Sequence, residues 1–390
     1  MAEWIECKIS DIGTVVGGAT PSTKKAENYE GGNIAWITPK DLSTFSGRYI
    51  KRGERNITEI GLKSCSTQLL PKNTVLFSSR APIGYVAIAA NEVCTNQGFK
   101  SVIPNEETDP LFLFYLLKHN KEKIEAMGSG TTFKEVSGNT MKNIIVRVPS
   151  DKEVQKNIAS ILGTLDDKIE ENERINNNLE QQAKALYKDW FFDFSPFSTK
   201  GNLPDGWHLG TVGDIIQLHD SKRVPLSGSE RDKMEKIYPY YGATSLMDYV
   251  DNYLFDGIYL LLGEDGTVVD SLGFPILQYV YGQFWVNNHA HIITGKEGFS
   301  VEELYLFFSL TNIKSIVTGA VQQKVSQQNL KKVPAIIPSK EALSAFDDLI
   351  QPIFAQIRNL RDENAHLADL RDTLLPRLMS GELDVSDTEI

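Results

Sequence analysis

Cysteine is scarce in this 390-residue chain, and the spacing of its cysteines argues against disulfide, metal and redox sites. The three cysteines, Cys7, Cys65 and Cys94, lie far apart, without the spacings typical of disulfide frameworks, zinc sites or redox motifs. The chain also lacks an apolar run long enough to cross a membrane, and its first ten residues have no apolar core of a signal peptide. We therefore expect a cytoplasmic protein with reduced thiols and no membrane segment.

Recognisable catalytic motifs are absent as well. The sequence has no GxxxxGK[ST] phosphate loop, no glycine-rich dinucleotide loop, and no Asn-Pro-Pro-aromatic or Asp-Pro-Pro-aromatic tetrapeptide of an amino-methyltransferase. Two alternatives stay open, His289 with His291 as metal ligands and Glu264 with Asp265 as a carboxylate pair. The histidines lack a third ligand at a suitable spacing, and the carboxylates lie between glycines, which favours a turn. We predict no metal, no cofactor and no catalytic residue in this chain.

Positive charge is also limited. The formal net charge of −11 argues against a protein that coats nucleic acid through its bulk charge. Residues 1–150 nevertheless carry three more basic than acidic residues. One stretch collects many of them: Lys40, Arg48, Lys51, Arg52, Arg55 and Lys63. Binding of DNA must therefore depend on local patches or on a basic partner.

Two matched heptad repeats are the most regular feature of the sequence. Apolar residues and asparagines recur in steps of three and four through residues 151–192, and the pattern returns 188 residues later. The predicted coiled-coil seam consists of Ile158, Leu162, Leu165, Ile169, Asn176, Leu179, Leu186, Ile350, Ile353, Ile357, Leu360, Asn364, Leu367 and Leu374. Because each seam needs an apolar partner, we predict that the two helices pack antiparallel as one strut with pseudo-twofold symmetry.

The sequence outside the helices repeats too. Trp4 and Asp11 recur as Trp207 and Asp214. The predicted fold class is α+β, with two mixed α/β domains alternating with two long helices. We expect a first target-recognition domain at residues 1–150, a heptad helix at 151–192, a linker at 193–205, a second target-recognition domain at 206–338, a second heptad helix at 339–380 and a flexible tail at 381–390.

Inside each domain the residue pattern predicts short strands and one amphipathic helix. We expect the helices at residues 110–127 and 301–316, and one strand at 93–102. The loops differ between the halves although the framework repeats, which favours two sites of one kind for two different targets.

Several motifs, taken in order, resemble those of the specificity (S) subunits of type I restriction–modification systems. They are Gly17–Ser22, Ile34–Ile37, Lys40–Leu42, Leu76–Gly84, Thr95–Gly98, Tyr240–Ala243, Leu260–Gly266 and Leu374–Gly381. The resemblance covers the whole chain. It implies a non-catalytic subunit of a restriction system that binds double-stranded DNA, two methyltransferase (M) subunits and restriction (R) subunits. It also implies that S-adenosylmethionine, ATP and Mg are bound by those partners, which methylate adenine or cleave DNA.

Loop chemistry adds a set of expected DNA contacts. Arginine suits guanine edges, asparagine and glutamine suit adenine, and hydroxyls suit phosphates. In the first domain the expected contacts are Thr20, Ser22, Lys51, Arg52, Ser78, Ser79, Arg80, Asn96, Gln97, Thr132 and Lys134. In the second they are Lys222, Arg223, Tyr241, Asn287, Asn288, Gln322, Gln323 and Lys324. Two unlike domains on one strut predict an asymmetric bipartite DNA site, with one half-site per domain.

Two other classes remain as alternatives. One is a scaffold that binds no DNA and carries two peptide-binding modules on a coiled-coil strut. The acidic net charge favours this scaffold, whereas the loop residues favour DNA. The other is an enzyme with its own nuclease or methyltransferase site, which lacks every motif expected of it.

Overall fold

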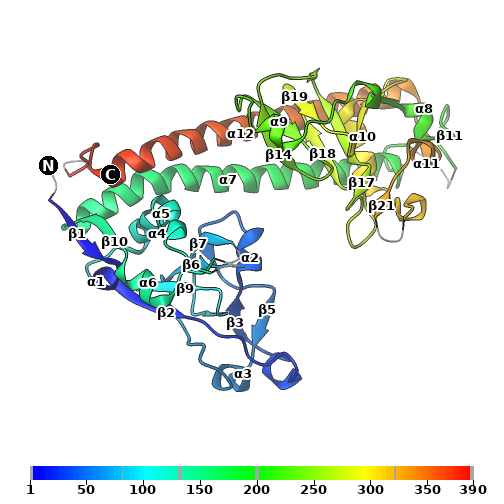
Figure 1. The fold of residues 1–390 in the computed structure, drawn as a ribbon. Coiled ribbons are helices and arrows are strands. Elements are labelled where there is room, and N and C mark those ends of the chain that lie inside the picture. The colour runs from blue at the N-terminus through cyan, green and yellow to red at the C-terminus, as the bar shows by residue number, and fades with distance from the viewer. Residues whose placement is uncertain (1–2, 81, 131–133, 198–201, 320–321, 387–390) are drawn as a thin grey trace. The chain divides into compact units, whose positions relative to one another are not determined.

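The computed structural model describes residues 3–80, 82–130, 134–197, 202–319 and 322–386. The chain divides into two compact units, the first made of residues 1–172 with 362–390 and the second of residues 173–361. Each unit combines one globular domain with parts of two long helices, α7 (Lys152–Phe191) and α12 (Lys340–Ser380) (Figure 1). Within the part of the chain that is described, no helix is long and apolar enough to cross a membrane.

The first domain is built on a five-stranded sheet with the order β2-β9-β6-β7-β4. Its strands are β2 (Gly13–Gly17), β9 (Lys100–Pro104), β6 (Val75–Ser79), β7 (Ile83–Ala89) and β4 (Tyr49–Ile50). A smaller sheet contains β5 (Arg55–Ile57), β3 (Ile34–Ile37) and β8 (Cys94–Thr95), and β1 (Trp4–Lys8) pairs with β10 (Ile145–Pro149). The helices are α1 (Ile9–Ile12), the 3-10 turn η1 (Ala26–Asn28), α2 (Pro39–Ser43), α3 (Glu59–Lys63), α4 (Pro110–His119), α5 (Lys121–Ala126) and α6 (Gly138–Asn143).

The second domain has a four-stranded sheet with the order β12-β20-β16-β18. Its strands are β12 (Ile216–Leu218), β20 (Ala290–Gly295), β16 (Tyr259–Gly263) and β18 (Leu277–Val280). A second sheet joins β14 (Leu246–Val250), β13 (Tyr238–Tyr241), β19 (Gln283–Val286) and β15 (Phe255–Asp256), while β11 (His208–Thr211) pairs with β22 (Pro334–Ile337) and β17 (Asp265–Gly266) with β21 (Gln323–Lys324). The helices are α8 (Val212–Ile215), η2 (Asp220–Lys222), α9 (Gly228–Arg231), α10 (Val301–Leu310), η3 (Lys314–Ile316) and α11 (Gln327–Lys331).

The two domains share the core of one topology, although their sheets differ in the number of strands. In each large sheet a central strand, β6 or β16, lies between two antiparallel partners, which are β9 and β7 or β20 and β18. In the smaller sheets β3 and β13 pair in parallel with β8 and β19. The repeat in the sequence is therefore a duplication of the fold, and the predicted α+β class with mixed domains alternating with long helices is confirmed.

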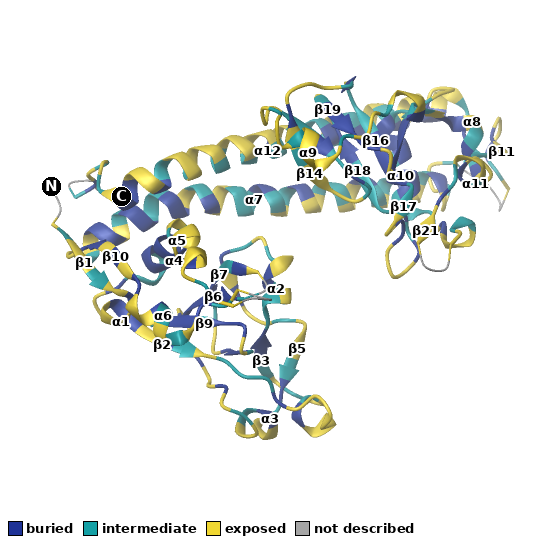
Figure 2. Cartoon of the chain, viewed as in Figure 1, coloured by how far each residue is buried: buried dark blue, intermediate teal, exposed yellow. Residues whose placement is uncertain are grey.

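In the first unit the long helices run antiparallel, as predicted. Asn172 Nδ2 donates a hydrogen bond to Asn364 Oδ1 at 2.9 Å, and Arg371 Nη1 donates to Asp166 Oδ1 at 2.6 Å. Rising numbers on α7 thus meet falling numbers on α12. Buried residues follow one stripe along each helix, and exposed residues cover the opposite face (Figure 2).

The helices of the second unit have the same relative direction. Arg361 on α12 pairs with Glu180 on α7 at 3.1 Å, and the ring centroids of Phe346 and Phe191 are 4.8 Å apart. The expected seam residues differ in burial. Fully or nearly fully buried are Ile158, Leu162, Asn176, Ile350, Ile357 and Leu360, while Leu165, Ile169, Leu179, Leu186, Ile353, Asn364, Leu367 and Leu374 are half-buried.

Both amphipathic helices are shorter than the pattern predicted. The helix expected at residues 110–127 breaks at Asn120, whose side chain donates to the Leu116 carbonyl at 2.8 Å, and α5 then restarts. The helix expected at 301–316 ends at Leu310, where Thr311 Oγ1 donates to the Phe307 carbonyl at 2.7 Å. In both cases a polar side chain competes with the backbone for the last carbonyls.

The strand expected at residues 93–102 is likewise divided. Its two ends form β8 and β9, which belong to different sheets. Between them Asn96 Oδ1 accepts a hydrogen bond from the Gly98 N–H at 2.8 Å and holds a turn. The strand pattern of residues 93–102 therefore covers two strands of different sheets, which the pattern alone does not separate.

Candidate nucleic-acid interface

In the first domain, the segment that follows β2 packs against the turn between β8 and β9. The Ala19 N–H donates to the Thr95 carbonyl at 3.0 Å, and Thr20 Oγ1 donates to the side chain of Gln97. Gly18 permits this approach, because a Cβ atom there would lie 2.2 Å from the Thr95 carbonyl oxygen. The fold thus brings together two of the predicted contact residues, Thr20 and Gln97.

Ser78 and Ser79 lie in β6, and both are completely buried. Ser78 Oγ donates to the Pro82 carbonyl at 2.9 Å and accepts from the Tyr85 N–H at 2.8 Å. The Ser79 N–H and Oγ both donate to the Gly98 carbonyl, at 2.7 and 3.1 Å. These hydroxyls hold the β6–β7 connection to its neighbours, and none of their surface faces solvent.

Arg80 follows at the start of the β6–β7 connection and is half-exposed. It forms a β-bridge with Glu135, and its Nη1 lies 3.6 Å from Glu135 Oε2. Lys100 Nζ reaches the other oxygen of the same carboxylate at 3.2 Å. Glu135 therefore orients two basic side chains. Glu135 and Lys100 are not among the predicted contacts, although Glu135 directly follows the predicted contact Lys134.

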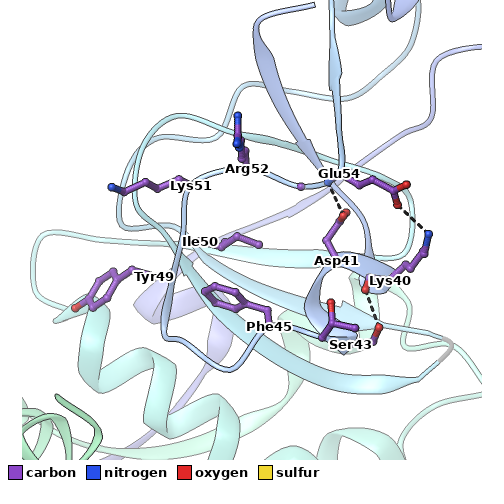
Figure 3. A pocket seen from close by; sticks show the side chains of 11 residues that line it. Lys40, Asp41, Ser43, Phe45, Tyr49, Ile50, Lys51, Arg52 and Glu54 are labelled. Carbon is purple, nitrogen blue, oxygen red and sulfur yellow. Dashed lines mark hydrogen bonds and ion pairs between the residues drawn. The ribbon is translucent and has the colours of Figure 1, made fainter. Parts of the chain in front are cut away.

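Lys51 and Arg52 form the most available basic pair of the first domain. Both are exposed, and within the described residues neither side chain has an ion-pair partner. They line an open pocket of about 630 Å³, in which their side chains extend away from Phe45 and Ile50 (Figure 3). A shallow depression with apolar walls and two free cations is chemically suited to a phosphate backbone.

Two other members of the basic stretch have partners inside the domain. Lys40 pairs with Glu54 at 2.8 Å, and Arg55 lies over the ring of Tyr29 at 4.1 Å from its centroid. Arg48 is buried. Of the six clustered cations, Lys51, Arg52 and Lys63 are exposed without a partner within the described residues.

The remaining predicted contacts of this domain are divided between surface and interior. Ser22, Gln97 and Lys134 are exposed, whereas Thr20 and Asn96 are half-buried. Thr132 lies outside the described residues.

In the second domain, the side chain of Arg223 is largely enclosed and hydrogen-bonded within the domain. Its Nη1 donates to Glu264 Oε2 at 2.6 Å and to the Ala290 carbonyl at 2.8 Å, and its Nε donates to the Asp220 carbonyl at 3.0 Å. Only 13% of its side chain is exposed. Arg223 therefore ties η2 to the end of β16 and to the start of β20.

His291 and Asp220 extend the same buried cluster. His291 Nδ1 lies 2.7 Å from Asp220 Oδ2, and its Nε2 lies 2.8 Å from the Val325 carbonyl. Gln327 Nε2 donates to Asp220 at 2.6 Å. Burial by itself would raise the pKa of Asp220, but the hydrogen bond and charge of His291 together with the Ile292 N–H hold this pKa below its usual value.

This cluster also contains ligand types that metals accept. Carboxylate and imidazole atoms of Asp220, Glu264 and His291 lie within 4.8 Å of one another. In this structure, however, Arg223 and Gln327 donate to the two carboxylates. His289 has a separate environment, since its Nδ1 lies 2.6 Å from Asp265 Oδ1. The two histidines considered as a ligand pair therefore belong to different clusters.

Lys324 lies on the short strand β21, next to this cluster. Its side chain is 53% exposed, and its Nζ lies 3.5 Å from Glu264 Oε1. Gln322 and Gln323 beside it are exposed, as are Lys222 and Asn288. Exposed donors thus surround an interior of paired charges.

Two further predicted contacts contribute to packing. Asn287 is buried, and its Oδ1 accepts from the His289 N–H at 2.8 Å. Tyr241 is half-buried beside Phe284, with ring centroids 5.9 Å apart. Its backbone carbonyl accepts from the Asn287 N–H at 3.0 Å, so the two residues join β13 to the end of β19.

The two domains carry opposite charges at matched strand positions. Arg80 faces Glu135 in the first domain, and Asp265 faces Lys324 in the second. The backbone bonds nearby correspond as well, because the Val136 N–H donates to Ser79 and the Val325 N–H donates to Glu264. The basic residue therefore lies on the β6–β7 connection in the first domain and on β21 in the second.

Comparison with known proteins gives a consistent result. Residues 1–181 and 204–365 match the family of type I restriction modification DNA specificity domains. The chain is 35% identical to the specificity subunit of the type I restriction enzyme MjaIX of Methanocaldococcus jannaschii, across 99% of this chain and 94% of that relative. It is 23% identical to the EcoprrI specificity subunit of Escherichia coli, across 90% and 89% of the two chains. The crystal structure of the S subunit of a type I restriction-modification system from M. genitalium has the same fold, with a TM-score of 0.58 at 18% identity over 97% of this chain and 96% of that one.

Proposed function

Because this chain belongs to the type I restriction–modification DNA specificity family, we propose that each of its two domains reads one half of an asymmetric bipartite DNA site. The observation that carries the proposal is the pairing of one shared topology with different side chains at matched positions. The division into recognition domains at residues 1–150 and 206–338, with the two long helices between and after them, belongs to this proposal.

The exposed members of the predicted set are the direct contacts in this proposal. They are Ser22, Lys51, Arg52, Gln97 and Lys134 in the first domain and Lys222, Asn288, Gln322, Gln323 and Lys324 in the second, with half-exposed Arg80 as a candidate guanine reader. Lysines suit phosphates, and the amides suit adenine edges. Buried Ser79 and largely enclosed Arg223 act indirectly, by holding the loops that carry these contacts.

The partners in this proposal are two methyltransferase subunits and the restriction subunits. Adenine methylation requires the base to leave the helical stack, and a pocket for such a base belongs to the methyltransferase. This chain contributes sequence reading and a place to assemble, while S-adenosylmethionine, ATP and Mg are used by the partners. Its net charge of −11 agrees with a grip on DNA that the partners share.

The test uses the chain assembled with its methyltransferase subunits. Mapping of methylated adenines in the source genome, with and without this gene, should reveal a bipartite motif that disappears with the gene. Replacing Gln322, Gln323 and Lys324 together by alanine should relax one half of the motif and leave the other unchanged. Equal relaxation of both halves would contradict the division of labour between the domains.

The acidic net charge keeps a second candidate in view, a scaffold that binds peptides on its two domains. The same preparation separates the two functions. A complex that methylates a defined motif excludes the scaffold. A complex that neither binds nor modifies duplex DNA at low salt, where phosphate contacts are strongest, would favour it.

A further inference from the structure

The first domain is fastened to α7 by a buried cation. Arg48 is 5% exposed, and its Nε donates to Glu170 Oε1 at 3.0 Å. Its Nη1 donates to the Gly163 carbonyl at 3.2 Å, and its Nη2 pairs with Asp167. The domain supplies the positive partner, and the helix supplies two carboxylates.

The second domain is fastened to α12 by a buried anion. Glu302 of α10 is 3% exposed, and its Oε1 accepts from Arg358 Nη1 at 3.1 Å and from the Tyr279 hydroxyl at 2.6 Å. Gln351 Nε2 donates to its second oxygen at 3.2 Å. Here the domain supplies the negative partner, and the helix supplies the cation.

The two helix partners occupy the same place in the repeat. Glu170 and Arg358 are 188 residues apart, the offset that relates the two heptad seams. Their domain partners come from different elements, because Arg48 precedes β4 and Glu302 lies in the first turn of α10. The opposite polarity is therefore a property of the helix position and is matched separately by each domain.

We propose that these ion pairs make the docking of domain and helix selective. In this proposal α7 binds only a domain that buries a cation against Glu170, and α12 binds only a domain that buries an acid against Arg358. A duplicated chain contains two similar domains and two similar helices, which makes docking in the wrong combination a real competitor. In the wrong combination Arg48 would meet Arg358, and Glu302 would meet Glu170. Either contact would leave a buried charge, Arg48 or Glu302, against a like charge without its compensating partner.

The ion pairs can discriminate between the two domains because one member of each pair is buried. An ion pair between solvent-exposed side chains has little effect on stability, because water screens it. Arg48 and Glu302 are each more than nine-tenths buried, so neither can be hydrated in place of its lost partner without opening the contact between helix and domain. This inference concerns the assembly of the chain and is independent of which DNA sequence the domains read.

Reversal of one pair in the full-length chain is the first test. Glu302→Arg and Arg358→Glu should each lower the Tm by at least about 5 °C, and the double variant should regain at least half of the summed loss. The Tyr279 hydroxyl and the Gln351 amide can accept as well as donate, so both tolerate the reversed pair. Arg377→Glu is the matched control on the same helix, since its side chain is 45% exposed and pairs only with Glu382 within the described residues. A double variant as unstable as the two single losses combined would overturn the proposal.

Exchange of the domains provides the second test. A chain with residues 1–150 and 206–338 transposed should show reduced soluble yield and a lower Tm. The same transposed chain with Glu170→Arg and Arg358→Glu, which exchanges the polarity of the helices, should recover both. A transposed chain as stable as the natural one, or no gain from the two helix substitutions, would overturn the proposal. DNA binding is not the readout, so neither result depends on the function proposed above.

Discussion

Arg80 and Lys324 lie at corresponding ends of the two domains. The backbone pairing there is alike, but the charged side chains are arranged differently. In the first domain Glu135 is 39% exposed between Arg80 and Lys100. In the second domain Glu264 is 15% exposed between Arg223 and Lys324. The first arrangement is a partly exposed group of three side chains, and the second is a more enclosed cluster that also involves Asp220. The difference teaches that the framework tolerates exchange of charge between strands as long as every buried charge keeps a partner.

The largest expected difference between the domains lies at the matched residues Ser79 and Glu264. Glu264→Ala leaves the Arg223 guanidinium buried with only Asp220 as a carboxylate partner, and should lower the free energy of unfolding by about 3–5 kcal/mol. Ser79→Ala removes the hydrogen bond to the Gly98 carbonyl and the longer one, at 3.4 Å, from Lys100 Nζ, with an expected loss of about 1–2 kcal/mol. Urea denaturation of both variants measures the contrast. Equal losses would show that the cluster around Glu264 is no stronger than the hydroxyl of the first domain.

A pH-dependent difference is expected at the first turn of the domain helices. Glu303 is the third residue of α10, and Phe112 is the third residue of α4. Burial raises the pKa of Glu303 from 4.5 to about 8, the hydrogen bonds from Ser300 oppose this, and the charge of Asp347 adds to it. Because the folded pKa exceeds the unfolded one, the protonated carboxyl stabilises the fold most below about pH 4.5, and this stability is lost as the pH rises to about 8.

Glu303→Gln should therefore change the pH profile of stability. The variant keeps the neutral form at every pH, so its advantage over the natural chain should grow by about 1.4 kcal/mol per pH unit between pH 5 and 8. Urea denaturation at several pH values provides the measurement, and the control is Glu341→Gln, at an exposed residue in the first turn of α12. An advantage of equal size at pH 5 and pH 8 would show that Glu303 does not titrate in this range.

The smallest expected effects concern recognition itself. Arg80→Ala and Lys324→Ala should each weaken binding of the assembled complex to one half-site and leave the other unchanged. Arg80 should contribute about 1–3 kcal/mol if it reads a guanine, and the loss should depend on the base. Lys324→Ala should weaken binding to all sequences at its half-site and reduce the dependence of affinity on salt. Competition binding with half-site variants at two salt concentrations distinguishes these results. A base-dependent loss for Lys324 would assign it to a base.

Sequence reasoning was most successful where a repeating pattern encodes structure locally. The heptad spacing predicted two long antiparallel helices, and they span Lys152–Phe191 and Lys340–Ser380. Their pairing followed from the need of each apolar stripe for a partner, and their antiparallel direction from the domain between them, which must return the chain to the start of the second helix. Boundaries set by single polar side chains were missed, as at Asn120 and Thr311, because periodicity continues past a residue that caps a helix.

The sequence by itself determined the duplication, the alternation of domains and helices, and the polar character of the loops. The tertiary structure determines which of the loop side chains remain exposed to solvent. Arg223 and Lys324 are both basic loop residues in the sequence, yet Glu264 and the Ala290 carbonyl, 41 and 67 positions away, enclose the first and leave the second at the surface. A charged side chain is available to a ligand only when part of it still reaches solvent, and the groups that enclose it are brought close by folding rather than by order in the chain.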